Sequence, residues 1–149
     1  MMLAYRATAA SDATRAQRLF ASVTRYRLCS AYCHGGVVVG QRLYHANLAH
    51  GLHDTDWTPA HWDLIDVGTQ RDADVLALYA ELKGTPYDTL GVLGFGLPGV
   101  REDGGRLYCF EWQALALGRP PRRWETPEST LVTALRQGGR WVEQAQGLA

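Results

Sequence analysis

The chain has 149 residues, of which 46% are hydrophobic and 20% charged, and its formal net charge is zero. This length allows one domain with a substantial hydrophobic core, so we expect a single domain over residues 1–149. The balanced charge argues against a nucleic-acid partner, because nucleic-acid-binding surfaces carry an excess of lysine and arginine. No apolar run approaches the length of a membrane span.

The first residues, 1–6, lack the charged start and long apolar core of a secretory signal, which predicts synthesis in the cytoplasm. Residues 3–8 alternate loosely between apolar and polar side chains, which predicts an edge strand. Ser11 is a good N-cap, and the chain from there to about Arg27 has helical character. The apolar residues that recur at helical spacing and are expected to face the core are Ala16, Leu19, Phe20 and Val23.

A hairpin follows this helix. Residues 37–39 are three consecutive valines between glycines, which predicts a strand. Residues 42–47 are expected to form the partner strand, joined to the first by a tight turn at Gly40 and Gln41.

The register of this hairpin decides which polar side chains meet. With a two-residue turn, Val39 lies opposite Arg42, and His34 then lies opposite Asn47. His45 is placed on the same face as His34, one diagonal position away. A slip of one residue would move His45 to the other face.

The middle of the chain continues with residues 50–59, which are predicted to be a polar loop. Residues 61–67 alternate and predict a third strand. An amphipathic helix is expected over 72–83, with Gly84 as its cap. Residues 88–95 predict a short apolar helix.

The last third begins with a loop at 97–105, rich in glycine and charge. A helix is then expected to open close to Cys109 and to stop at Gly118. After an extended connector at 119–123, a helix is predicted over 126–137 with proline at its first position, followed by a loose polar tail. Hairpin-linked strands with few parallel crossovers predict an α+β fold, a small antiparallel sheet packed against helices.

Three residues form a candidate catalytic constellation. A thiol nucleophile needs a base to take its proton and a polar group to orient that base. Cys109, in the first turn of a helix, lies at the positive end of the helix dipole, which favours the thiolate. His34 is the candidate base and His45 the candidate orienting residue.

Other interpretations of these residues remain open. Asn47 and then Asp66 are the alternatives to His45 as the orienting group. The composition alone favours the structural interpretation. In it, His34 and His45 are strand residues with their hydrogen bonds satisfied within the sheet, and Cys109 packs in the core, because isolated cysteines are usually buried.

A zinc site is a further alternative. Cys29, Cys33 and His34 lie within six positions, and all five histidines fall between residues 34 and 61. However, the sequence has no CxxC or HExxH motif, and the adjacent Cys33 and His34 would point to opposite faces of a strand. We therefore predict no metal site.

The order of these motifs resembles the circularly permuted branch of the NlpC-type papain-like cysteine hydrolases, which includes the YiiX-like proteins. That family shows Ser-His before an apolar strand, then Gly-x-x-Tyr-Asp, then Phe-Cys-Ser-Glu opening a helix that stops at Leu-Gly. The corresponding segments here are 33–39, 84–88, 108–111 and 117–118. The segment 62–65 resembles the family's middle strand, and the spacing of His34 and His45 is similar to that in the related lecithin retinol acyltransferase group.

The resemblance implies a permuted papain-like fold and a hydrolase without cofactor or metal. Cys109 would attack an amide or ester carbonyl to give a thioester, His34 would shuttle the proton, and His45 would orient His34. The backbone amide of Cys109 would form part of an oxyanion hole. Two departures from the pattern are Cys33, where the family has serine, and Phe110, which places a bulky side chain beside the nucleophile.

The implied substrate is a peptide bond of cell-wall peptidoglycan. Compact chains of this type occur among phage proteins, so the resemblance also implies a phage-encoded protein associated with the virion and active during infection or lysis. A thiol acyltransferase or lipase-like enzyme is the alternative among enzymes. An alternative of another class is a catalytically silent binding or assembly module, such as a phage tail component.

Overall fold

The fold is α+β, and the computed structural model describes residues 1–8, 13–94, 104–122 and 125–142. In these ranges the strands form one antiparallel sheet in the order β4-β3-β2-β1-β5-β6. Its strands are β1 (Met2–Arg6), β2 (His34–Val39), β3 (Arg42–Asn47), β4 (Gly51–Asp56), β5 (Asp63–Asp66) and β6 (Arg140–Val142). The helices are α1 (Arg15–Leu28), α2 (Asp72–Leu82), α3 (Thr89–Gly94), α4 (Cys109–Ala116) and α5 (Pro127–Arg136). None of these described helices has both the length and the apolar character needed to cross a membrane.

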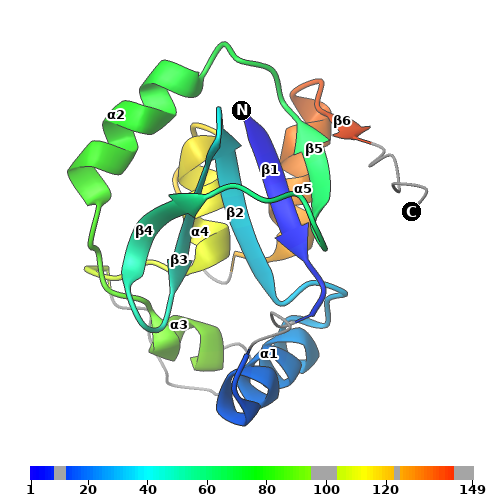
Figure 1. Cartoon of the computed structure of the whole chain (residues 1–149), viewed down its shortest axis with the longest axis vertical. Helices are drawn as coiled ribbons and strands as arrows, with labels where there is room; N and C mark the ends of the chain where they lie inside the picture. Colours follow the sequence, from blue (N-terminus) through cyan, green and yellow to red (C-terminus); the bar gives the residue numbers. More distant parts are fainter. Residues whose placement is uncertain (9–12, 95–103, 123–124, 143–149) are drawn as a thin grey trace.

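The two faces of the sheet are covered differently. In Figure 1, α4 and α5 lie behind the sheet, whereas the chain from β4 to β5 crosses in front of it. The larger core includes Tyr5 and Val37 together with the apolar residues of α4. A smaller cluster on the other face contains Val38, Leu43 and Trp62. Because neighbouring residues of a strand point to opposite faces, this alternation assigns every side chain of β2 to one face or the other.

Helix α4 is buried on nearly all sides, as expected for a helix enclosed by a core rather than lying on a surface. It begins at Cys109, and the carboxylate of Glu111 accepts a hydrogen bond from the backbone N–H of Tyr108 at 3.0 Å, which caps the first turn. Gly35 permits the close approach of β2, because a Cβ atom there would lie 2.7 Å from the ring of Phe110.

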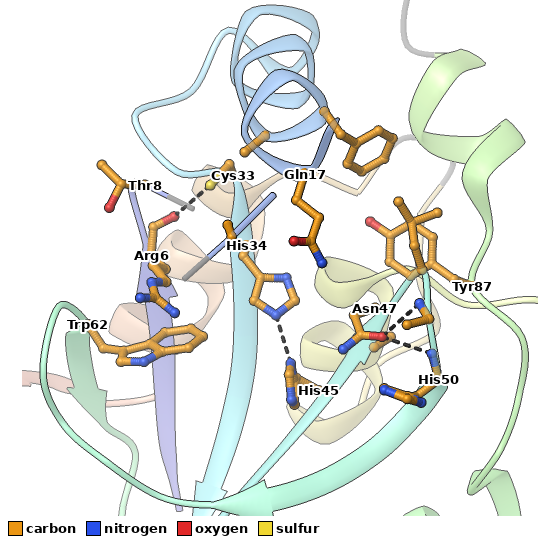
Figure 2. A pocket seen from close by; sticks show the side chains of 16 residues that line it. Arg6, Thr8, Gln17, Cys33, His34, His45, Asn47, His50, Trp62 and Tyr87 are labelled. Carbon is orange, nitrogen blue, oxygen red and sulfur yellow. Dashed lines mark hydrogen bonds between the residues drawn. The ribbon is translucent and has the colours of Figure 1, made fainter. Parts of the chain in front are cut away.

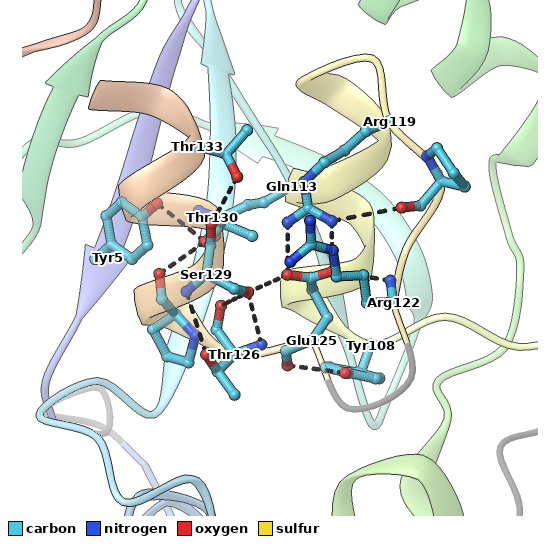
Figure 3. A network of polar contacts seen from close by, with 12 residues as sticks. Tyr5, Tyr108, Gln113, Arg119, Arg122, Glu125, Thr126, Ser129, Thr130 and Thr133 are labelled. Atoms are coloured by element: carbon cyan, nitrogen blue, oxygen red, sulfur yellow. Dashed lines mark hydrogen bonds and ion pairs between the residues drawn. The ribbon is translucent and has the colours of Figure 1, made fainter. Parts of the chain in front are cut away.

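A buried glutamine fixes the position of α4 on the sheet. The side-chain amide of Gln113 donates hydrogen bonds to the carbonyls of Ala4 and Gly36, at 3.0 and 2.9 Å, so that α4 is bound to β1 and β2 at once. Its carbonyl oxygen accepts from the hydroxyl of Thr130 in α5. Figure 3 shows this chain of contacts continuing to Tyr5, whose hydroxyl lies 3.1 Å from that of Thr130.

A buried ion pair connects the end of α4 to the start of α5. The guanidinium of Arg119 contacts both oxygens of Glu125, at 2.7 and 2.6 Å, and the Glu125 side chain has no exposed surface. Ser129 and the backbone N–H of Arg122 also donate to this carboxylate (Figure 3). Burial alone would raise the pKa of Glu125, but these hydrogen bonds and the charge of Arg119 lower it below its usual value. The carboxylate therefore stays ionised and paired inside the protein.

Several predicted elements are confirmed. The hairpin has the expected register, with Val39 opposite Arg42. Helix α2 covers 72–82, and α5 begins with Thr126 as N-cap and proline at its first position. The strand expected at 61–67 is β5, and α4 begins at Cys109 as expected.

Two predictions about the sheet are wrong. The strand near the N-terminus is not an edge strand, because β1 pairs with both β2 and β5. The predicted polar loop at 50–59 contains β4, which is an edge strand. Its polar residues suit that place: Asp54 binds Arg42 of β3, while Leu52 supplies the buried contact.

The ends of the chain also differ from expectation. Helix α1 begins at Arg15 with Thr14 as its N-cap, and Ser11 lies outside the described residues. Leu19, which was expected to face the core, is 67% exposed. Part of the expected C-terminal tail, 140–142, pairs with β5 as β6. The loop predicted at 97–105 lies mostly outside the described residues.

We expect Gln113→Leu to lower the free energy of unfolding by about 2 kcal/mol or more, because it removes two donors to buried carbonyls while keeping similar volume. Chemical denaturation of the purified chain measures this change. Gln41→Leu, in the exposed hairpin turn, is the matched control and should leave stability nearly unchanged. Equal stability of the two variants would contradict the role given to Gln113.

Candidate functional site

A pocket of about 410 Å³ opens at the end of the sheet where β1 stops and β2 begins. One wall comes from α1 and the segment before it, and the others come from the strand ends and from Trp62 and Tyr87. Figure 2 shows Arg6 and Trp62 on one side of His34, with Asn47 and His50 on the other. The described polar or aromatic residues of the lining are Arg6, Thr8, Gln17, Phe20, Cys33, His34, His45, Asn47, His50, Trp62 and Tyr87.

Two of the predicted site residues meet in this pocket. The Nε2 atom of His34 lies 2.8 Å from Nδ1 of His45, a hydrogen-bond distance (Figure 2). This contact follows from the confirmed register, which places the two rings on one face of β2 and β3. With Nε2 of His34 as the donor, Nδ1 of His34 remains available to accept a proton. His45 then carries its hydrogen on Nε2, a buried atom without a hydrogen-bond partner among the described residues.

Neither alternative orienting residue contacts His34 in this arrangement. The side-chain amide of Asn47 lies 3.3 Å from Nε2 of His53, and its oxygen accepts hydrogen bonds from the backbone of the following turn. Asp66 is on β5, two strands from β2, and accepts from the backbone N–H of Gly68. Of the three candidates, the geometry therefore favours His45.

Both histidines are neutral at neutral pH. Burial and the positive charge of Arg6 lower the pKa of His34 to about 4. Burial and the neighbouring imidazole of His34 lower the pKa of His45 to about 2. A neutral imidazole can act as a general base, so His34 is in the form that accepts a proton.

Cys109 occupies the first position of α4 but is not part of the pocket wall. It is only 1% exposed. The backbone of Gly35 hydrogen-bonds its sulfur, and so does the side chain of Tyr87, which itself lines the pocket. Burial raises the pKa of this thiol to about 12, against the smaller lowering by backbone hydrogen bonds. The thiolate expected from the helix dipole is therefore not favoured.

The thiol and the histidine pair lie on opposite faces of β2. Gly35 faces α4, since a Cβ atom there would meet Phe110. His34 precedes it, packs 5.8 Å from the ring of Trp62 and shares the other face with Val38. The structure thus brings His34 and His45 together, and it brings Cys109 against the backbone next to His34 without bringing it into the pocket.

The zinc interpretation has no geometric support within the described residues. No three side chains of histidine, cysteine, aspartate or glutamate converge there as ligands. Cys29 is exposed, while Cys33 is buried with its thiol directed to the carbonyl of Arg6 at 3.4 Å.

Arg6 is a site residue that the sequence analysis missed. It pairs directly with His34 across β1 and β2, and its guanidinium lies 5.4 Å from the centre of the Trp62 ring. The sequence signal that could have found it is a lone arginine ending an otherwise apolar strand, 2–6. That signal becomes specific only once the partner strand is known.

Comparisons with protein-family models, with curated proteins and with solved structures found no match to this chain.

The lowered pKa values predict a pH dependence of stability. The unfolded chain binds protons at histidines near pH 6.5, whereas folded His34 does so only near pH 4. The contribution of neutral His34 to the free energy of unfolding is therefore complete above pH 6.5 and is lost as the pH falls toward 4. This loss amounts to at most about 1.4 kcal/mol per pH unit. We expect His34→Gln to flatten the decline in unfolding free energy over this range, as measured by denaturation at stepped pH. His61→Gln, at an exposed residue outside the pocket, should keep the wild-type slope, and equal slopes in all three proteins would refute the assignment.

Proposed function

We propose that the chain is a cysteine hydrolase that cleaves an amide bond, with a peptidoglycan peptide as its substrate and a permuted papain-like arrangement of its elements. The observation that carries this proposal is the 2.8 Å contact between His34 and His45 in the pocket wall. It supplies an oriented, neutral base at the start of β2, the strand against which the helix that begins at Cys109 packs. The phage origin implied by the resemblance remains a prediction.

The reaction would proceed in two steps. The sulfur of Cys109 attacks the carbonyl carbon of the substrate while its proton passes to Nδ1 of His34. His45 accepts the Nε2 hydrogen bond of the imidazolium. His34 then gives the proton to the departing amine, and a thioester remains on Cys109. Water, activated by His34, attacks the thioester and releases the carboxylic acid and the free thiol.

This reaction requires a rearrangement of the resting protein. Cys109 is buried and His34 points to the opposite face of β2, so the sulfur and the imidazole must move around the start of that strand. Tyr87 contacts both places, because its side chain lines the pocket and hydrogen-bonds the thiol. His34 is the first residue of β2, at one end of its ladder with β1, so a rearrangement there need not break the rest of the strand pairing.

The burial of Cys109 favours a second candidate function. A thiol that is 1% exposed, with a pKa of about 12, suits a core residue of a catalytically silent binding module. In that case the pocket around His34 would bind a ligand without turning it over. The two functions differ in whether any covalent bond of the substrate changes.

Digestion of purified peptidoglycan, with products identified by mass spectrometry, tests the hydrolase. We expect soluble fragments that carry one new amine and one added water per cleaved bond, and no fragments from Cys109→Ala. Release of the same fragments by Cys109→Ala would refute the nucleophile, and an inactive wild-type chain that still binds peptidoglycan would favour the silent module.

A pair of pocket variants tests the orienting residue. We expect His45→Ala to lower turnover on the order of 10²-fold, because His34 loses the acceptor for its Nε2 hydrogen. Asn47→Ala, in the same pocket, tests the alternative orienting residue and should lower turnover much less, because Asn47 bonds His53 and the following turn rather than His34. Initial rates of fragment release measure both. The reverse pattern would show that Asn47, rather than His45, orients the base.

A further inference from the structure

Arg6 is a half-buried cation at the end of β1, and it has no counter-ion in the described part of the chain. Its guanidinium makes no hydrogen bond or ion pair with a described residue, and its Nε atom is buried without a partner. An arginine in a pocket wall normally binds a carboxylate or an ordered acceptor, because leaving its donors unpaired costs free energy. Arg6 instead packs on the ring of Trp62, and its side chain lines the pocket.

The surroundings of Arg6 hold its charged group in place. The guanidinium carbon of Arg6 lies over the Trp62 ring, 5.4 Å from its centre, and the centre of the Trp57 ring lies 6.0 Å from that of Trp62. A guanidinium stacked on an aromatic ring keeps its N–H edge free for a planar, bidentate acceptor. Figure 2 shows Arg6 and Trp62 on the same side of the pocket, next to His34.

The described residues of the pocket wall carry a net positive charge. None of its described lining residues is an aspartate or a glutamate. His34 and His45 are neutral at neutral pH, so Arg6 supplies one positive charge from this group. One positive charge matches a singly charged anion and would leave a doubly charged phosphate partly uncompensated.

We propose that Arg6, supported by Trp62, is the binding site for a carboxylate group of the ligand, placed directly beside His34. This site stands whether or not Cys109 is a nucleophile, since it rests on the pocket alone. A carboxylate at this position would lie across the β1–β2 pair from His34, because Arg6 and His34 are register partners. The ligand class is thus an acid that extends from this anchor past the two histidines, toward Asn47 and His50.

Binding of the carboxylate would also act on His34. The positive charge of Arg6 is the second cause, after burial, of the low pKa of His34. An anion paired with Arg6 cancels that charge and makes the imidazole a stronger base. The carboxylate that pairs with Arg6 would thereby also raise the basicity of His34.

Two probes that differ in one group test this site. N-acetyl-L-alanine carries a carboxylate, and N-acetyl-L-alaninamide carries a neutral amide of nearly the same shape. Each is titrated into the full-length chain at neutral pH and constant ionic strength, and the histidine and tryptophan signals are followed by NMR. We expect the acid to bind at least tenfold more tightly than the amide and to raise the pKa of His34.

The variants are chosen to separate binding from folding. Arg6→Gln should abolish the preference for the acid, and Arg6→Lys should retain part of it because lysine keeps the charge but not the planar fork. Arg136→Gln, at an exposed residue of α5 far from the pocket, changes the net charge equally and should bind as the wild type does. Circular dichroism of each variant checks that it is folded.

Three results would overturn the proposal. These are equal binding of acid and amide by the wild-type chain, retention of the acid preference by folded Arg6→Gln, and tighter binding of inorganic phosphate than of the acid. The first of them needs no variant, so a failure of Arg6→Gln to fold leaves the test decisive. Because the measurement follows binding, an inactive protein that prefers the acid would disprove the hydrolase and keep the carboxylate site.

Discussion

The side chain of Gln113 is the contact on which the arrangement of the sheet and its helices depends. Its amide donates to carbonyls of β1 and β2, and its oxygen accepts from α5, so one residue holds two strands and two helices together. A buried amide with its hydrogen bonds satisfied specifies a single position, whereas apolar packing alone tolerates sliding. Gln113 thereby fixes where the N-terminus of α4 meets β2, and with it the position of Cys109 against Gly35.

The sheet divides the chemistry of the molecule between its two faces. On one face, α4 buries the thiol among apolar side chains, where the neutral form is favoured. On the other face, His34 and His45 form their hydrogen bond in a pocket whose described wall carries the positive charge of Arg6. The boundary between them is the backbone of β2 at its first two residues. Catalysis by Cys109 would have to cross that boundary, whereas ligand binding at Arg6 would not.

Local patterns in the sequence were sufficient for much of the structure. The valine run, the Gly40-Gln41 turn and the Thr126-Pro127 cap each specify their element through contacts only a few residues apart, and the pairing of His34 with His45 follows from the turn alone. Which side of α4 packs against the sheet could not be predicted, because it depends on the contacts of Gln113 and Gly35, which are far apart in the chain. Arg6 was missed for the same reason: its partner His34 lies 28 positions later, and such register is not encoded locally.

If Cys109 is a nucleophile with His34 as its base, an acyl-enzyme must form, and trapping it is the decisive test. The Cys29→Ser chain, which lacks the exposed thiol, is mixed with p-nitrophenyl acetate, and nitrophenol release and intact mass are followed together. We expect a burst of one nitrophenol per chain with the acetyl group on Cys109, absent in the Cys109→Ala variant of the same chain and slowed in its His34→Ala variant. Release without a burst, with acetyl groups spread over exposed lysines, would contradict it.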